Sequence, residues 1–274
     1  MKLILRTVAT VSLLLSAFAP SSAPAAEARI QGLLGFESFG LRDFPMERVV
    51  STTHELGLEY VEVFPGHMDP ASEPAKIDAA LKLLAEKKIR LSAAFVGNAG
   101  PDIAANRRLF EYARKVGTRI IIVNEIDERG IEGLNKLCAE YSEIRVCLHN
   151  HGPASQGASL ARVQALLTKL NPHVGACIDT GHVMRSREDP VAWVRALKGR
   201  IFGVHLKEYH GDRPLSPKSD LATKEVLLEL AAAGFPDYGA LTVEFEGTPK
   251  DPFDGIAQSI GYVRKLIAEI NGGK

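Results

Sequence analysis

The sequence predicts an α/β protein built as a single (β/α)8 TIM barrel, and three observations support this prediction. From about residue 30, short apolar runs of β type alternate with stretches of helical apolar spacing. Eight such pairs fit into about 245 residues, close to the usual size of this fold. The last of the strand-like runs stop abruptly at Asp, His or Glu, as expected at the C-terminal strand ends where the functional residues of a barrel gather.

The expected strands are continuous apolar runs, which are typical of parallel strands buried on both faces. They cover residues 32–36, 58–64, 89–95, 118–123 and 144–148, followed by three strands ending at Asp179, His205 and Glu244. Helical spacing predicts helices at 45–54, 74–88, 101–116, 131–141, 160–170, 190–197, 223–233 and 256–270. A doubly wound open sheet is the competing fold, but the glycines between 32 and 40 lack the GxGxxG spacing that it would need.

The first residues have the pattern of an export signal. Lys2 and Arg6 form a basic start, residues 8–19 are apolar, and Ala23-Pro24-Ala25 is an A-x-A cleavage pattern. The apolar stretch is short for a bilayer span, so stable membrane insertion is not expected, although an uncleaved anchor is the alternative. We therefore expect residues 1–26 to be an export signal peptide, residues 27–274 to form the catalytic barrel, and the protein to be periplasmic or secreted.

Charge and cysteine content narrow the classes of partner. Lys+Arg and Asp+Glu both number 33, so the basic excess typical of a nucleic-acid-binding protein is missing, and a small molecule is the expected partner. The oligomeric state stays open.

Three cysteines do not make a disulfide framework. Cys147 and Cys177 should point inward below the site, either as free buried thiols or, alternatively, as a disulfide.

Polar residues at the last strand ends predict a metal site. Asp179, His205 and Glu244 each follow or sit within an apolar run, and Glu244 is preferred over Glu246 because it is the last position with apolar neighbours on both sides. The preceding run ends at His149-Asn150-His151 and adds imidazole. A mixed nitrogen and oxygen ligand set suits one divalent Mn, Co, Fe or Zn ion better than Mg or Ca.

The runs Asp-Thr-Gly-His at 179–182, Val-His-Leu-Lys at 204–207 and Val-Glu-Phe-Glu-Gly at 243–247 together resemble the xylose-isomerase-like TIM barrels. That superfamily includes sugar phosphate isomerases/epimerases, ketose 3-epimerases, inosose dehydratases and endonuclease IV. The resemblance covers the whole expected barrel and is strongest from residue 144 onward. It implies metal-dependent chemistry on a sugar, with substrate contact by His182. The implied metal ligands are His149, Asp179, His205 and Glu244.

One departure from the family pattern bears on mechanism. Many members carry Glu-Asn-His-Gly where this chain has His149-Asn150-His151-Gly152. In the ketose epimerases, glutamates on strands five and eight both bind metal and act as opposed bases. An imidazole bound to metal cannot do that, so we expect a metal-polarised carbonyl and one separate base. The candidate bases are Glu246, His182 and His151. Lys207 is expected either to hold a developing enolate oxygen or to be a solvated surface lysine.

Four more residues are candidates for substrate contact. Glu62, His67 and Glu125 lie at or just past the ends of strands two and four, and Arg42 follows the first strand. Each is expected either to contact the substrate, as a hydroxyl ligand or a clamp, or to be an ordinary loop or helix-entry residue.

The leading functional expectation is an exported, metal-dependent sugar or keto-sugar isomerase/epimerase. A lyase, a hydratase or a keto-glycoside-cleaving enzyme on the same scaffold is the alternative, and the histidine at 149 favours it. A non-catalytic sugar-binding protein is a further alternative. The export signal and the zero net charge oppose a DNA-repair function of the endonuclease IV type.

Overall fold

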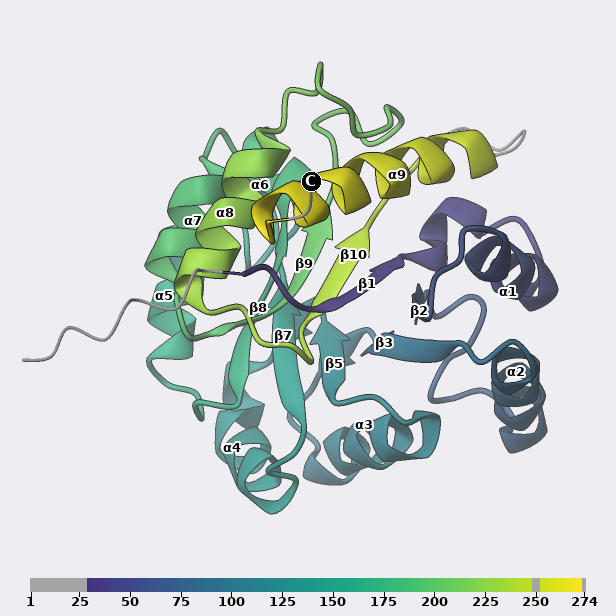
Figure 1. Ribbon diagram of the computed structural model, residues 1–274. Helices are drawn as coiled ribbons and strands as arrows, with labels where there is room; N and C mark the ends of the chain where they lie inside the picture. The colour runs from purple at the N-terminus through teal and green to yellow at the C-terminus, as the bar shows by residue number, and fades with distance from the viewer. Residues whose placement is uncertain (1–28, 248–251, 273–274) are drawn as a thin grey trace, which may run out of the picture.

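The computed structural model describes residues 29–247 and 252–272, and these form a barrel of eight parallel strands surrounded by helices (Figure 1). The strands follow one another around the barrel in the order β1-β10-β9-β8-β7-β5-β3-β2. A parallel bridge between Glu37 and Glu62 brings the two edge strands together. The barrel strands are β1 (Leu33–Phe36), β2 (Tyr60–Val63), β3 (Arg90–Phe95), β5 (Ile120–Val123), β7 (Arg145–His149), β8 (Val174–Asp179), β9 (Ile201–Leu206) and β10 (Ala240–Val243).

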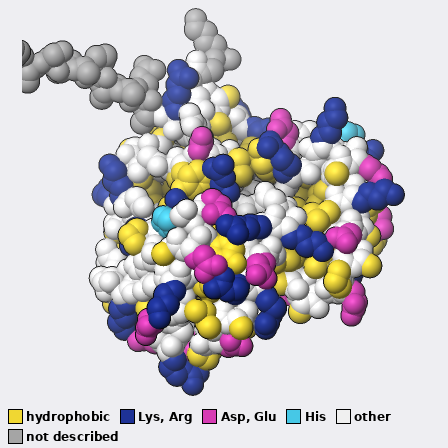
Figure 2. Space-filling model, turned by 90° about the horizontal axis from the view of Figure 1, so that it is seen from below, with side chains coloured by type: hydrophobic (Ala, Val, Ile, Leu, Met, Phe, Trp, Pro, Cys, Tyr) yellow, Lys and Arg dark blue, Asp and Glu magenta, His cyan; other side chains and the backbone are white. Residues whose placement is uncertain are grey.

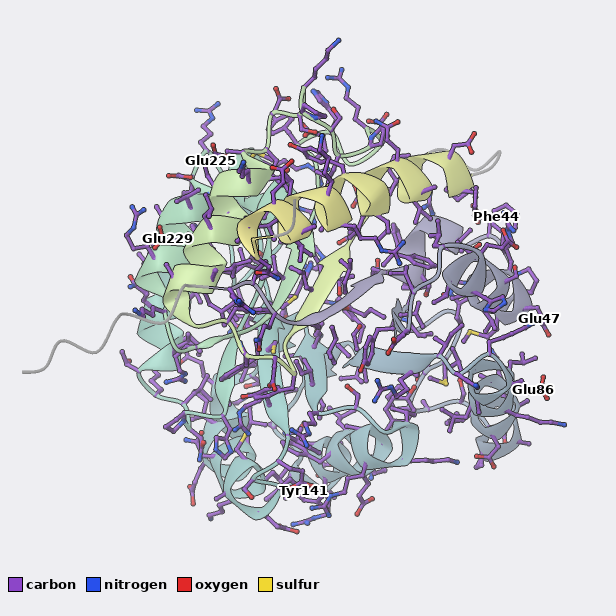
Figure 3. All side chains as sticks on the ribbon, in the orientation of Figure 1. Phe44, Glu47, Glu86, Tyr141, Glu225 and Glu229 are labelled. Atoms are coloured by element: carbon purple, nitrogen blue, oxygen red, sulfur yellow. The ribbon has the colours of Figure 1, made fainter. Side chains whose placement is uncertain are left out.

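The outer helices lie between the strands and cover the barrel (Figure 1). The last of them lies beside β1 and β10 on the outside of the barrel. Figure 3 shows Glu47, Glu225 and Glu229 on the solvent side of these helices, so their apolar sides are left to face the strands. The helices are α1 (Met46–Glu55), α2 (Pro74–Glu86), α3 (Ile103–Val116), α4 (Ile131–Glu140), α5 (Leu160–Leu167), α7 (Pro190–Ala196), α8 (Thr223–Ala233) and α9 (Phe253–Ile270).

The expected eight strand–helix pairs are confirmed, with differences of a few residues at the ends. Elements that the sequence patterns did not predict are short. They are the 3-10 turns η1 (Ser38–Leu41) and η2 (Glu128–Gly130), the two-residue strands β4 (Asn98–Ala99) and β6 (Glu125–Ile126), and the helix α6 (Thr180–Arg185). The last of these begins directly at the end of β8, because the Asp179 carboxylate accepts a hydrogen bond from the backbone N–H of His182 and caps it.

The barrel interior below the strand ends is filled by a small apolar cluster, which includes Cys147 and Cys177. All three cysteines are free and buried, so the free-thiol expectation holds and the disulfide alternative does not. The outer core between strands and helices includes Trp193, whose indole N–H donates to Glu188 at 2.5 Å.

On the face seen in Figure 2, basic and acidic side chains are interspersed. Within the described residues, no helix combines the length and the apolar character needed to cross a bilayer. The expected export signal at residues 1–26 lies outside the described residues.

Candidate metal centre and active-site cavity

Four neighbouring strands deliver the expected metal ligands to one rim of the barrel. His149 is the last residue of β7, Asp179 the last of β8, His205 the penultimate residue of β9, and Glu244 follows β10 directly. The strands pair in parallel register, with Asp179 opposite His205 and His205 opposite Thr242. Because a parallel barrel places all its carboxyl strand ends on the same rim, residues far apart in sequence meet there.

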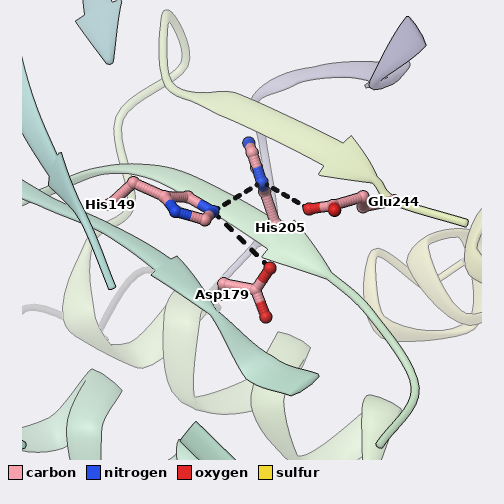
Figure 4. A group of neighbouring side chains, drawn as sticks. All are labelled: His149, Asp179, His205 and Glu244. Atoms are coloured by element: carbon pink, nitrogen blue, oxygen red, sulfur yellow. Dashed lines mark hydrogen bonds and ion pairs between the residues drawn. The ribbon is translucent and has the colours of Figure 1, made fainter. Parts of the chain in front are cut away.

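The ligand atoms of these four residues converge (Figure 4). One donor atom from each residue can be chosen so that all lie within 4.8 Å of one another, and all four side chains are buried. His205 Nδ1 lies 3.0 Å from His149 Nε2 and 2.9 Å from Glu244 Oε2. His149 Nε2 lies 3.5 Å from Asp179 Oδ2. The structure thus brings together the whole ligand set that the sequence analysis named.

Two further observations fit a divalent cation at this place. Asp179 Oδ2 is fully buried; Lys207 Nζ approaches it to 2.8 Å, but no hydrogen bond of acceptable geometry reaches this oxygen. Buried acceptors are rarely left without a hydrogen bond unless a ligand or ion satisfies them. Asp179, Glu244 and the nearby Glu62 are all buried carboxylates, and Lys207 is the buried lysine among them. The donor chemistry and this excess of carboxylate both suit a doubly charged ion.

A carboxylate behind His205 sets the orientation of that ring. Glu62 Oε1 lies 2.9 Å from His205 Nε2, and its other oxygen accepts a hydrogen bond from Thr242 Oγ1 at 2.9 Å. Since a carboxylate only accepts, Nε2 carries a proton toward Glu62, and Nδ1 is the ring nitrogen that faces His149 and Glu244 and that would bind an ion in its deprotonated form. Glu62 was a candidate for contact with sugar hydroxyls. The structure corrects this, because its side chain is fully buried and both its oxygens are used within the protein.

The electrostatics favour neutral imidazole at His149 and ionised carboxylates beside it. Burial lowers the pKa of His149 to about 3. Burial alone would raise the pKa of Glu244, but the Lys207 ammonium and the contact with His205 together outweigh it and hold that pKa at about 2. The pKa of Lys207 itself is raised, because Asp179 and Glu244 outweigh the effect of burial. Neutral imidazole and ionised carboxylate are the forms that bind metals.

Lys207 is buried and is not a surface lysine. Its side chain has no exposed area, and Nζ lies 2.8 Å from Asp179, 2.9 Å from Glu244 and 3.0 Å from Glu246. This corrects the alternative that it is solvated. It lies behind the ligand carboxylates and is not among the residues that line the cavity.

A cavity of about 310 Å³ opens beside the four ligands. His151 and His182, both candidate bases, line it with their rings 4.8 Å apart. Glu246, the third candidate, also lines it, but its carboxylate is held by Lys207 at 3.0 Å and by Arg185 at 3.2 Å. The two imidazoles are therefore freer than Glu246 to exchange a proton with a substrate.

Glu37 lines the same cavity and was missed in the sequence. It is buried, and burial, followed by the negative charge of Glu244, raises its pKa well above the usual range. It directly follows β1, so the strand-end rule that found the other residues would have found it as well. The lining also includes groups not expected from the sequence: Phe39, Phe64, Pro65, Phe95, Gly97 and Asn124.

The structure does not bring the other three substrate candidates to this cavity. His67 is buried and bonds to Ser38 Oγ at 2.9 Å and to the Phe44 carbonyl at 2.9 Å. Arg42 donates to the Phe39 carbonyl and, with His67, lines a separate outer groove near α1 and α2. Glu125 is exposed in β6 and lines another surface hollow. Hydrogen bonds to neighbouring loop residues hold His67 and Arg42 outside the lining of the cavity.

A parallel eight-stranded barrel with a four-residue His/Asp/Glu cluster at its C-terminal rim is a TIM barrel with a candidate metal site. The family description "xylose isomerase-like TIM barrel" matches residues 50–266, and the chain belongs to that family. This confirms the resemblance drawn from the strand-end motifs. No curated protein matches the chain significantly.

Solved structures share the fold at low identity. An L-ribulose 3-epimerase structure is 15% identical, with TM-score 0.69, and the match covers 88% of this chain and 96% of that one. A probable 3-DHS dehydratase from Bacillus anthracis is 16% identical, with TM-score 0.64 and coverage of 86% and 99%. A sugar phosphate isomerase/epimerase from Parabacteroides distasonis is 14% identical, with TM-score 0.65 and coverage of 92% and 100%. At such identities the likeness establishes the fold.

Proposed function

We propose that this chain is a divalent-metal-dependent isomerase or epimerase of a sugar or keto-sugar, and that it works by abstracting a proton next to a carbonyl. The observation that carries the proposal is the buried four-residue ligand set beside a cavity lined by two further imidazoles. The epimerases among the structural relatives support the substrate class.

His149, Asp179, His205 and Glu244 would hold the ion, and their two nitrogens and two carboxylates favour Mn, Co, Fe or Zn over Mg. A divalent ion held there supplies a Lewis acid that polarises a substrate carbonyl and so acidifies the neighbouring C–H. Glu62 keeps His205 in the tautomer that binds, and Lys207 balances the charge of the carboxylates.

His151 and His182 are the proposed proton-transfer groups. Both lie on the cavity wall from the β7 and β8 side. Glu37 lines the cavity from β1, which is four positions from β7 in the strand order of the barrel. A substrate between them would meet an imidazole on one side and a carboxyl group on the other, as a proton removal followed by a proton delivery requires.

A lyase is the second candidate, and His149 favours it. With imidazole in place of a ligand glutamate, the pair of opposed metal-bound glutamates cannot form. An acid and a base on separate residues also suit an elimination, in which one group removes the proton and the other protonates the leaving group. The dehydratase among the structural relatives shares the fold.

The test is a set of free ketoses and 3-keto-glycosides incubated with the Mn²⁺-loaded protein in D2O and followed by NMR. Deuterium entering a C–H next to the carbonyl, with inversion, supports the epimerase, and C–O cleavage supports the lyase. His205→Ala should abolish exchange and lose the metal by elemental analysis, whereas His210→Ala, an exposed histidine outside the ligand set, should do neither. Absence of exchange with every sugar would leave sugar binding without catalysis as the function.

We also propose that the protein acts outside the cytoplasm after removal of residues 1–26. Mass spectrometry of the exported protein tests this, and an intact N-terminus would contradict it.

A further inference from the structure

The cavity beside the ligand set has two unlike walls. The strands β7 to β10 and the segments that follow them supply the candidate metal ligands and the imidazoles of His151 and His182. The adjoining strands β1, β2 and β3 supply Phe39, Phe64, Pro65 and Phe95. Because these strands follow one another around the barrel, the apolar residues form one arc that faces the metal ligands, with Glu37 as the carboxyl group on the same side. We call Phe39, Phe64, Pro65 and Phe95 the aromatic wall.

Within the aromatic wall, Phe95 is the phenylalanine whose ring contacts the ligand histidines, among the residues that the structure describes. The Phe95 ring centroid is 5.4 Å from that of His149 and 6.4 Å from that of His205. Phe39 and Phe64 pack edge to face at 5.1 Å. Among the described residues, the ring and cation contacts of this pair are with each other, with His67 and with Arg42. A sugar whose carbonyl faces the ligand set therefore reaches Phe95 first, which leaves the Phe39–Phe64 pair for a second group.

The Phe39–Phe64 pair is held in place from behind. The Ser38 hydroxyl accepts a hydrogen bond from the Phe64 backbone N–H at 2.8 Å and lies 2.9 Å from His67 Nδ1. The Arg42 guanidinium lies over the Phe39 ring, 4.7 Å from its centroid. A side chain at Gly66 would collide with the Phe64 ring, so the glycine is needed for the observed ring position. His67 and Arg42 thus serve the cavity indirectly.

We infer that the Phe39–Phe64 pair binds an aromatic aglycone, so that the substrate is the keto derivative of an aryl glycoside and not a free monosaccharide. The inference rests on the proposed function for the sugar half of the ligand. Edge-to-face and offset contacts with a planar ring are the arrangements that phenylalanine favours. The cavity volume of about 310 Å³ lies at the lower end of the range for drug-sized ligands, which suits a sugar with one attached ring. A polar chain in that place would lose hydrogen bonds to water without replacement.

The inference is tested by calorimetric titration of the full-length, Mn²⁺-loaded protein with two probes, phenyl β-D-glucopyranoside and methyl β-D-glucopyranoside. Because the phenyl ring adds buried apolar area and aromatic contacts, we expect it to bind at least about tenfold more tightly than the methyl glycoside. Phe64→Ala should remove this preference, and Gly66→Ala, which displaces the same ring without deleting it, should reduce it. Phe44→Ala, which removes a ring from the outer groove near α1 (Figure 3), should keep it.

Equal binding of the two probes, no binding of either, or a preference that persists in Phe64→Ala would overturn the inference. Metal content and thermal unfolding of each variant establish that it is folded and loaded. Neither probe carries the keto group that the proposed reaction needs, so binding is read without turnover. If the protein prefers the phenyl probe but catalyses no deuterium exchange, the proposed function is rejected and the aromatic site is retained. If exchange occurs without a preference for the phenyl probe, the aromatic site is rejected and the proposed function is retained.

Discussion

Glu62 Oε1 on β2 lies 2.9 Å from His205 Nε2 on β9, although the two residues are 143 positions apart. The contact crosses the barrel interior and leaves His205 Nδ1 directed at His149 and Glu244. A carboxylate that accepts the second ring proton of a metal-binding histidine sets its tautomer and raises its basicity. Glu62 therefore belongs to the candidate metal centre without being one of its four ligands.

Glu62→Gln should weaken metal binding by about 10–100-fold, the usual effect of removing such a partner. The amide keeps the size of the side chain but removes the negative charge that stabilises the N–H group at Nε2 of His205. Competition with a chromophoric chelator measures the affinity. Glu125→Gln, an exposed change in β6, is the matched control and should have wild-type affinity. Wild-type affinity in Glu62→Gln would show that the contact is only structural.

Lys207→Met should destabilise the apoprotein by about 3–5 kcal/mol, since removing one partner of a buried ion pair leaves charges uncompensated. Here the ammonium faces the carboxylates of Asp179 and Glu244 without exposure to solvent. Excess Mn²⁺ should recover part of the loss, because a cation bound to the folded state replaces some of the missing charge. Urea unfolding with and without Mn²⁺ measures both effects. Equal destabilisation under the two conditions would argue against a cation site between these carboxylates.

His149→Glu should keep the metal but lower the native turnover. Carboxylate is an acceptable ligand, yet the added negative charge weakens the polarisation of a bound carbonyl. The change also restores the ligand set of the ketose epimerases, so some ketose epimerisation is expected to appear. Steady-state rates on whichever ketose or 3-keto-glycoside the wild-type protein converts, together with elemental analysis, check this. Unchanged turnover would mean that the histidine does not shape the chemistry.

The three cysteines should resist alkylation at pH 8 in the folded protein. Burial raises the pKa of Cys138 to about 12 and that of Cys177 to about 11, and it also raises the pKa of Cys147. All three are then protonated thiols at pH 8, and only the thiolate is reactive. Mass spectrometry after iodoacetamide treatment should show no adduct on the native protein and three adducts after unfolding in urea. A single adduct in urea would reveal a disulfide.

Local patterns were sufficient to find three of the four converging side chains, and the family resemblance added His149. Asp179, His205 and Glu244 each interrupt an apolar run at a strand end. In a parallel barrel the carboxyl ends of all strands lie at the same rim. The same rule applied to β1 would have found Glu37. The strand-end rule also placed Glu62 near the site but gave it the wrong role. The position of Glu62 at a strand end does not show that His205 and Thr242, on other strands, occupy both of its carboxylate oxygens.

The sequence by itself determined the alternation of strands and helices and the residues at the strand ends, because both follow from the local spacing of apolar and polar residues. Only the tertiary structure decided that Lys207 is buried among carboxylates, that Arg42 and His67 support a wall of the cavity from behind, and that Phe39 and Phe64 meet on it. Those relations depend on how the closed barrel brings distant segments together and on which way each loop turns after its strand. The local spacing of residues does not specify barrel closure or the path of a loop.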